Sequence, residues 1–225
     1  MEQRATFVNF FGHAVLAATG GRNSEFVLGS MLPDFISILG VRPPRLEMGT
    51  LARGVAFHHR TDAVFHDSAV FRSLQRQASE HLLALGVRRG PVRAVAHVGV
   101  ELLIDAALAW SLSDTAPSTD ESYLDALELG SAPLASLSPQ AWSESDRLMA
   151  LCQRLRQVGV DRFRVDAHGA MTELSRILAR RPRLALVDTE AAVVSGWAAQ
   201  AFVVVKTDLP QLLDELKNGL EVDFA

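Results

Sequence analysis

Hydrophobic residues recur every three or four positions through most of the chain, which is the spacing of an amphipathic α-helix. The first such segment has apolar side chains at Phe7, Phe10, Phe11, Ala14, Val15 and Ala18. Gly20 and Gly21 follow it, and glycine commonly ends a helix because it adopts the left-handed backbone conformation. Segments with the alternating pattern of a β-strand are scarce. The pattern therefore predicts an all-α fold.

Residues that start or stop helices divide the rest of the chain. Ser68 has the character of an N-cap, and Pro91 stands where the first turn of a helix tolerates a missing N–H. Helices are predicted over residues 54–67, 69–85, a segment from Gly90 that carries His97, and 139–158, 161–179, 188–206 and 209–220. Loops are predicted at 29–34, 40–44 and 113–120, the last as a lid or a linker.

The chain has 225 residues, which is long enough for one domain with a full hydrophobic core. We expect a single all-α domain over residues 1–225, built as a multi-helix bundle. The candidate site lies in the half formed by residues 1–112. A loop at 113–120 separates it from a helical C-terminal half, residues 121–225.

Composition narrows the functions that the chain can have. The net charge is -4, so the chain has no basic excess for binding nucleic acid. Cys152 is the single cysteine, which excludes a zinc site built from cysteines. The apolar stretch 191–205 is too short to span a bilayer. The apolar run 5–18 follows Arg4 as in a signal peptide, but Asn9 and His13 interrupt it and disfavour that interpretation. We expect a cytoplasmic protein without a membrane span.

Two segments carry possible metal ligands at positions i, i+4 and i+8. These are His58, Asp62 and His66 in the first segment, and His97, Glu101 and Asp105 in the second. Residues four apart lie one above the other on a helix, so each triplet forms a stripe of imidazole and carboxylate groups. Such nitrogen and oxygen donors suit Zn²⁺, Mn²⁺ or Fe²⁺. Burying carboxylates among apolar neighbours also requires compensation, which a cation provides.

His13, inside the first helix, and Asp34, after Pro33, complete a set of eight donors. A buried histidine can instead bond a carbonyl group, and an aspartate after proline can cap a turn. Taken together, the eight donors predict two divalent metal ions in one pocket, each with an open position for water. Such a pocket suits hydrolysis of a phosphoester by metal-activated water. Asp62, Arg60 and His59 are the candidate catalytic residues, and the arginine fork suits phosphate oxygens.

Three ordered motifs, residues 9–13, 29–35 and 54–62, resemble those of bacterial acyl carrier protein phosphodiesterases. The resemblance covers roughly residues 7–110. It implies an all-α, HD-domain-like metallophosphohydrolase acting on a phosphoester such as holo acyl carrier protein. His13, Asp34, His58 and Asp62 match the family's positions, and Glu101 and Asp105 match its late acidic pair.

The chain departs from that family at three positions. His66 replaces an aspartate, His59 replaces an arginine, and Ala106 replaces a histidine. A looser likeness exists to the zinc-dependent phospholipase C and nuclease group. Two other functions stay open: a di-iron carboxylate oxidoreductase, disfavoured by the i, i+4 spacing, and a helical binding protein with a vestigial metal site.

Overall fold

The computed structural model describes residues 10–112, 117–134 and 142–221. Every regular element in these ranges is a helix, and none of these residues belongs to a strand, so the all-α prediction is confirmed for this part of the chain. Contacts divide the chain into two compact units, residues 1–62 with 112–162, and residues 63–111 with 163–225. Each unit thus combines segments from both halves of the sequence. The single domain and its division at residues 113–120 stay predictions.

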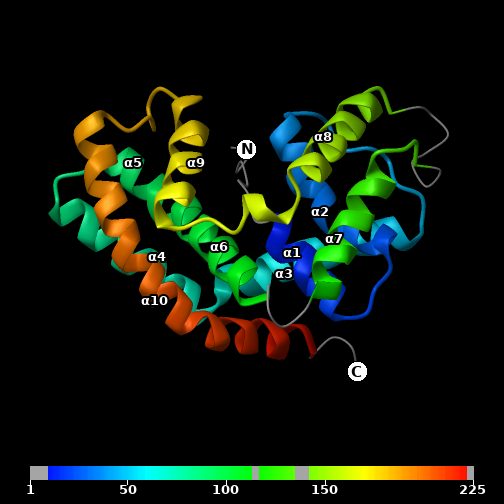
Figure 1. Ribbon diagram of the computed structural model, residues 1–225, viewed down its shortest axis with the longest axis horizontal. Coiled ribbons are helices and arrows are strands. Elements are labelled where there is room, and N and C mark those ends of the chain that lie inside the picture. The colour runs from blue at the N-terminus through cyan, green and yellow to red at the C-terminus, as the bar shows by residue number, and fades with distance from the viewer. Residues whose placement is uncertain (1–9, 113–116, 135–141, 222–225) are drawn as a thin grey trace. The chain divides into compact units, whose positions relative to one another are not determined.

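Unit 1 is built around three helices that contact one another, α1, α2 and α7, with α8 packed on α7 and α2 (Figure 1). Its elements are α1 (Phe10–Thr19), α2 (Ser24–Leu39), α3 (Thr50–Asp67) as far as residue 62, α7 (Pro117–Gly130), α8 (Ser145–Val158) and the 3₁₀ turn η2 (Val160–Arg162). Aromatic rings fill its core. Phe10 lies edge-on to Phe35 at 5.2 Å, and Phe11 lies edge-on to Tyr123 at 5.5 Å.

Helix α2 replaces the loop that was predicted at residues 29–34, so that prediction is wrong. The side chain of Asn23 accepts a hydrogen bond from the N–H of Phe26 at 3.1 Å and caps the helix start. Gly40 ends the helix in the left-handed conformation, with φ of 64°. Pro33 removes only one hydrogen-bond donor in between, and the burial of apolar side chains on both sides of it keeps the segment helical.

Gly29, which falls in the predicted loop, and Gly54 on α3 instead allow α2 and α3 to approach closely. A Cβ atom on Gly29 would meet the carbonyl oxygen of Leu51 and lie 2.9 Å from the Cα of Gly54. A Cβ atom on Gly54 would meet the carbonyl oxygen of Phe26 and lie 2.8 Å from the Cα of Gly29. The two backbones therefore touch without intervening side chains. This contact fixes the spacing between the later turns of α2 and α3, which carry Asp34 and His58.

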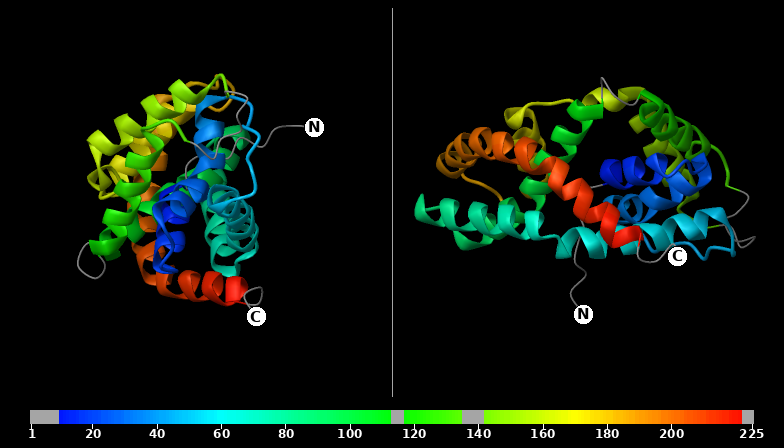
Figure 2. Two further views of the ribbon diagram at one scale, coloured as in Figure 1. Left: turned by 90° about the vertical axis from the view of Figure 1, so that its right-hand side faces the viewer. Right: turned by 90° about the horizontal axis from the view of Figure 1, so that it is seen from below.

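Unit 2 is organised around the long helix α10, which packs against α4 and α9 (Figure 2). Its elements are the last turn of α3, α4 (Ala69–Ala84), α5 (Arg89–Ala94), the π-helical segment η1 (Val95–Gly99), α6 (Val100–Leu112), α9 (Ala167–Ala179) and α10 (Asp188–Glu221). Ser68 caps α4 as predicted, since its hydroxyl accepts a hydrogen bond from the N–H of Phe71 at 3.1 Å. The π-helical segment was not predicted.

Several predicted boundaries differ from the structure. Helix α7 already contains residues 117–120 of the predicted loop, and residues 113–116 lie outside the described part. The predicted helix start at 138–139 also lies outside it, while α8 ends at Val158 as predicted. Helix α9 begins at Ala167 rather than 161, because the side chain of Asp166 caps it.

Helix α10 runs without a break through Pro210, although two separate helices were predicted. The buried residues Val205, Leu209, Leu212 and Leu216 keep the helical spacing of three or four across this point. Continuous packing of this apolar face therefore outweighs the one hydrogen bond lost to proline.

Within the described residues, the helical run Arg89–Leu112 is long and apolar enough to cross a membrane, judged by length and composition alone. The absence of a membrane span stays a prediction. Of its most apolar window, 78% is buried inside the protein. The core helix of a globular protein has the same length and composition. The run also buries Glu101 and Asp105.

Candidate metal centre

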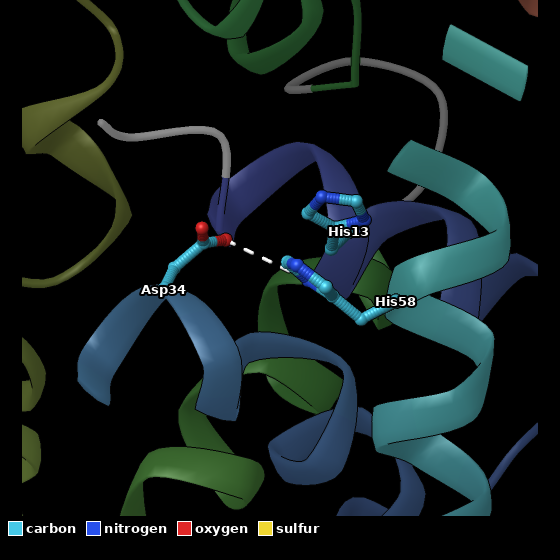
Figure 3. A group of neighbouring side chains, drawn as sticks. All are labelled: His13, Asp34 and His58. Carbon is cyan, nitrogen blue, oxygen red and sulfur yellow. Dashed lines mark ion pairs between the residues drawn. The ribbon is translucent and has the colours of Figure 1, made fainter. Parts of the chain in front are cut away.

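His13, Asp34 and His58 come together in unit 1 from three different helices, α1, α2 and α3 (Figure 3). Each side chain offers one ligand atom, and these atoms all lie within 4.8 Å of one another. The three residues are buried, with 2%, 0% and 3% of their surface exposed. Two imidazoles and a carboxylate form a donor set that binds a divalent transition metal.

The ring of His58 is oriented by the backbone of α2. Its Nδ1 lies 2.9 Å from the carbonyl oxygen of Ser30. A carbonyl oxygen can only accept, so Nδ1 carries the proton and Nε2 keeps its lone pair. Burial lowers the pKa of His58 to about 4, although the Ser30 bond and the charge of Asp62 act in the opposite direction. His58 is thus neutral at physiological pH, the form that binds metals.

The ring of His13 is oriented by a hydroxyl group on α3. Its Nδ1 lies 2.7 Å from Oγ1 of Thr61. That hydroxyl has one proton and donates it to a carbonyl oxygen of the preceding turn, Phe57 at 3.0 Å or His58 at 2.9 Å. The hydroxyl oxygen therefore accepts from Nδ1–H of His13, so Nε2 is the ring nitrogen that could bind a metal. Metal-binding histidines commonly donate their second N–H in this way.

The carboxylate of Asp34 is buried, and neither oxygen takes part in a hydrogen bond. One oxygen lies 3.8 Å from Nδ1 of His58 (dashed in Figure 3). Burial, followed by the charge of Asp62, raises the pKa of Asp34 well above its usual value. The lowered pKa of His58 favours a neutral imidazole, and the raised pKa of Asp34 favours a neutral acid. Both shifts therefore disfavour an ion pair between the two side chains. A buried carboxyl group beside two oriented imidazoles fits a site for a cation.

Asp62 lies half-buried on α3, one turn after His58. Its charge raises the pKa of both Asp34 and His58, so its carboxylate acts on the same group of residues. This position suits an additional ligand or a base beside the group.

Basic side chains gather in the same unit. The charges of Arg60 and Arg53, both on α3, contribute to lowering the pKa of Arg22, after burial. The guanidinium of Arg22 stacks on Phe26 at 4.3 Å. The exposed His59 places its ring edge-on to His58 at 5.3 Å. The three arginines suit an anionic ligand.

The remaining predicted ligands belong to unit 2. His66, His97 and Glu101 form a second group whose ligand atoms lie within 4.8 Å of one another. Asp105 is buried on α6 but belongs to neither group. The eight predicted ligands thus supply two groups of three, with Asp62 acting on the first; a pocket that holds two ions together stays a prediction.

The helical stripe explains this division. Eight residues of α-helix rise about 12 Å, whereas the donors of one ion lie within a few ångströms of one another. The first and last residues of a stripe therefore cannot bind the same ion. His58 and His66 accordingly belong to different groups, while the i, i+4 pair His97 and Glu101 is in contact at 3.4 Å.

Sequence reasoning missed the residues that orient the ligands. Thr61 stands between His58 and Asp62, and a hydroxyl buried beside predicted ligands is a signal that could have been used. The role of Ser30 depends on its backbone carbonyl, which no side-chain pattern reveals. Gln75, which contacts His97 at 2.7 Å, lies 22 residues away from it in the sequence.

Comparisons of the chain with protein-family models, with curated proteins and with solved structures found no match.

Proposed function

We propose that the protein is a metal-dependent phosphoester hydrolase whose centre is the group His13, Asp34 and His58. The observation that carries the proposal is the Asp34 carboxyl group, which is fully buried without a hydrogen bond beside two oriented imidazoles. A buried carboxylate is costly unless a cation or several donors compensate it. A divalent cation there, Zn²⁺, Mn²⁺ or Fe²⁺, supplies the Lewis acidity that lowers the pKa of a water molecule towards neutrality.

The side chains around the centre have separate roles in this proposal. His13 and His58 bind the cation through Nε2, since Thr61 and Ser30 hold their Nδ1–H groups. Asp62 either completes the ligand set or accepts the proton of the attacking water. The oxygen of that water would form the new bond to phosphorus as the bond between phosphorus and the ester oxygen breaks, and the ester oxygen would leave with the proton that the water gives up.

An anionic substrate is supported by the cations on α3 and near it. The charges of Arg60 and Arg53 both act on Arg22, so the three guanidinium groups lie within electrostatic reach of one another. In this proposal Arg60 binds phosphate oxygens, and the neighbouring His59 adds a further donor. The resemblance of residues 9–13, 29–35 and 54–62 to bacterial acyl carrier protein phosphodiesterases agrees with this substrate class. Holo acyl carrier protein is therefore a specific candidate, in an HD-domain-like enzyme.

The proposal is tested with the full chain, purified without chelator and loaded with Mn²⁺, Zn²⁺ or Fe²⁺. We expect hydrolysis of bis-p-nitrophenyl phosphate, and release of 4′-phosphopantetheine from holo acyl carrier protein as the specific activity. Asp62→Ala should abolish turnover. Asp34→Asn should abolish both turnover and tight metal binding, because an amide replaces the anionic ligand.

Two exposed residues provide matched controls. Asp67→Asn removes a carboxylate from the same helix as Asp62, and its side chain is 86% exposed in a surface pair with Arg72. Arg60→Ala should weaken substrate binding, and Arg72→Ala is its matched control. The two control variants, Asp67→Asn and Arg72→Ala, should retain full turnover. Unchanged activity of Asp62→Ala, or equal loss in Asp67→Asn, would contradict the assignment.

A further inference from the structure

His66, His97 and Glu101 bring three possible ligands together in unit 2. Nε2 of His97 lies 3.4 Å from Oε1 of Glu101, and Nε2 of His66 lies 3.9 Å from the same oxygen. The three side chains therefore converge on one point. They come from the last turn of α3, from η1 and from the first turn of α6.

Aromatic packing holds the two imidazoles in this arrangement. The rings of His66 and His97 are stacked, with centroids 5.0 Å apart and planes inclined by 13°. Phe71 meets both rings edge-on, at 5.1 Å and 5.9 Å. The rings thus keep their Nε2 atoms directed to the same side, which reduces the entropy lost when a ligand binds.

The backbone at His97 is also unusual. His97 lies in the π-helical segment Val95–Gly99, inside a helical run that continues on both sides. Such π-helical turns are rare and occur frequently at functional sites. This local distortion of the helix is a second observation, independent of the ligand distances.

Exposure distinguishes this group from the buried one in unit 1. The side chains of His66 and His97 are 30% and 39% exposed, whereas Glu101 is 2% exposed. The carboxylate therefore forms the inner part of the group and the imidazoles its solvent side. An ion bound by all three would keep a position open to water, as in three-ligand zinc sites.

Gln75 on α4 contacts the second ring nitrogen of His97. Its side-chain amide lies 2.7 Å from Nδ1. With the amide nitrogen in this position, Nδ1 accepts and Nε2 carries a proton facing Glu101. A half-turn of the amide places its oxygen there instead, so that Nδ1–H donates and Nε2 gains a free lone pair. Gln75 can thus stabilise His97 with its proton on either Nδ1 or Nε2.

We propose that His66, His97 and Glu101 form a second site for a divalent transition metal, with Gln75 as the positioning residue for His97. Two imidazoles and a carboxylate favour Zn²⁺, Co²⁺ or Ni²⁺ over Mg²⁺ and Ca²⁺. This site goes beyond the proposed hydrolase, because its ligands are separate from His13, Asp34 and His58.

The test is the stoichiometry of Zn²⁺ binding to the full chain, measured by calorimetry in excess Mg²⁺. The wild-type protein should bind two equivalents. The double variant His66→Ala/His97→Ala should bind one, and His58→Ala should bind one. Circular dichroism and thermal unfolding in the presence of chelator establish that each variant is folded.

These variants separate the two proposals. A double variant that still binds two equivalents overturns the second site, whatever happens in His58→Ala. If His58→Ala keeps both equivalents, the proposed hydrolase centre fails while the second site can still stand. Wild-type protein that binds only one equivalent, lost in His58→Ala, also overturns the second site.

Variants of Gln75 test the same site without removing a ligand. Gln75→Glu places an obligate acceptor beside Nδ1 of His97. It should raise the affinity of the Zn²⁺ ion bound by His66, His97 and Glu101. Gln75→Leu removes the partner and should lower that affinity about 10- to 100-fold, the usual effect of losing such a bond. Neither variant should change the affinity of the Zn²⁺ ion bound by His13, Asp34 and His58. Equal affinity in Gln75→Glu and Gln75→Leu would contradict the role of Gln75 and the binding of metal through His97.

Discussion

The close approach of α2 and α3 leads to the most specific prediction, the effect of Gly29→Ala. The added methyl group would lie 2.9 Å from the Cα of Gly54, whereas ordinary van der Waals contacts of a Cβ atom lie at 3.4–4 Å. The carbonyl oxygen of Leu51 would lie closer still, and both obstacles are backbone rather than a flexible side chain, so the helices must separate by roughly 1 Å. Overpacking of this kind costs about 1–3 kcal/mol, which lowers the melting temperature of a chain of this size by about 2–12 °C.

The same displacement affects the candidate metal centre. Ser30 follows Gly29 directly, and its carbonyl oxygen accepts from Nδ1–H of His58 at 2.9 Å. A separation of about 1 Å breaks this bond, since a donor–acceptor distance near 3.9 Å is not a hydrogen bond. We therefore expect the affinity of the His13, Asp34 and His58 group for Zn²⁺ to fall about 10- to 100-fold in Gly29→Ala.

Thermal unfolding and calorimetric titration with Zn²⁺ measure both effects. The control is Gly196→Ala, at an exposed position of α10 where a Cβ atom would meet nothing within 4 Å. Alanine has a higher helix propensity, so this variant should be more stable by about 0.5–1 kcal/mol with unchanged metal binding. Wild-type stability and metal affinity in Gly29→Ala would refute the reasoning.

Three further predictions concern other parts of the protein. Hydrogen bonding to Arg88 lowers the pKa of Glu190 from 4.5 to about 2, so its ionised form stabilises the fold fully above about pH 4.5 and this stabilisation is lost as the pH falls towards 2. Glu190→Gln should therefore destabilise the protein at pH 7 and flatten the pH dependence of thermal unfolding between pH 5 and 2; a curve parallel to the wild type would contradict this. Burial raises the pKa of the Cys152 thiol to about 12, so a thiol reagent should react at pH 8 only after denaturation, and immediate reaction of the native protein would disprove its burial. Asn23→Ala should cost about 1 kcal/mol in denaturant unfolding and Asn23→Gly only a few tenths, because alanine removes the cap of α2; equal stability of alanine variant and wild type would refute the capping role.

Local signals in the sequence predicted the start of a helix where a capping side chain precedes an apolar run. Ser68 caps α4 because a hydroxyl before an apolar run satisfies the first N–H groups. Pro33 and Pro210 misled the prediction, since each lies inside a helix held by buried apolar residues on both sides. Proline is a local signal, and the packing that outweighs it depends on residues distant in the sequence.

The sequence identified the candidate ligand residues, but it did not show which of them lie together in the folded chain. Spacing of i, i+4 placed His97 against Glu101 correctly, because that contact is local to one helical stripe. The group His13, Asp34 and His58 comes from three helices, and its geometry depends on the contact of Gly29 with Gly54. Sequence spacing contains no information on how helices cross, so the division of the ligands into two groups required the structure.

The central claim is that His13, Asp34 and His58 bind a metal ion, and anomalous X-ray diffraction at the zinc edge tests it most directly. Crystals of the full chain saturated with Zn²⁺ should show an anomalous peak about 2.0–2.2 Å from Nε2 of both histidines and from an oxygen of Asp34. A Zn²⁺-saturated crystal without a peak at these three residues would contradict the claim.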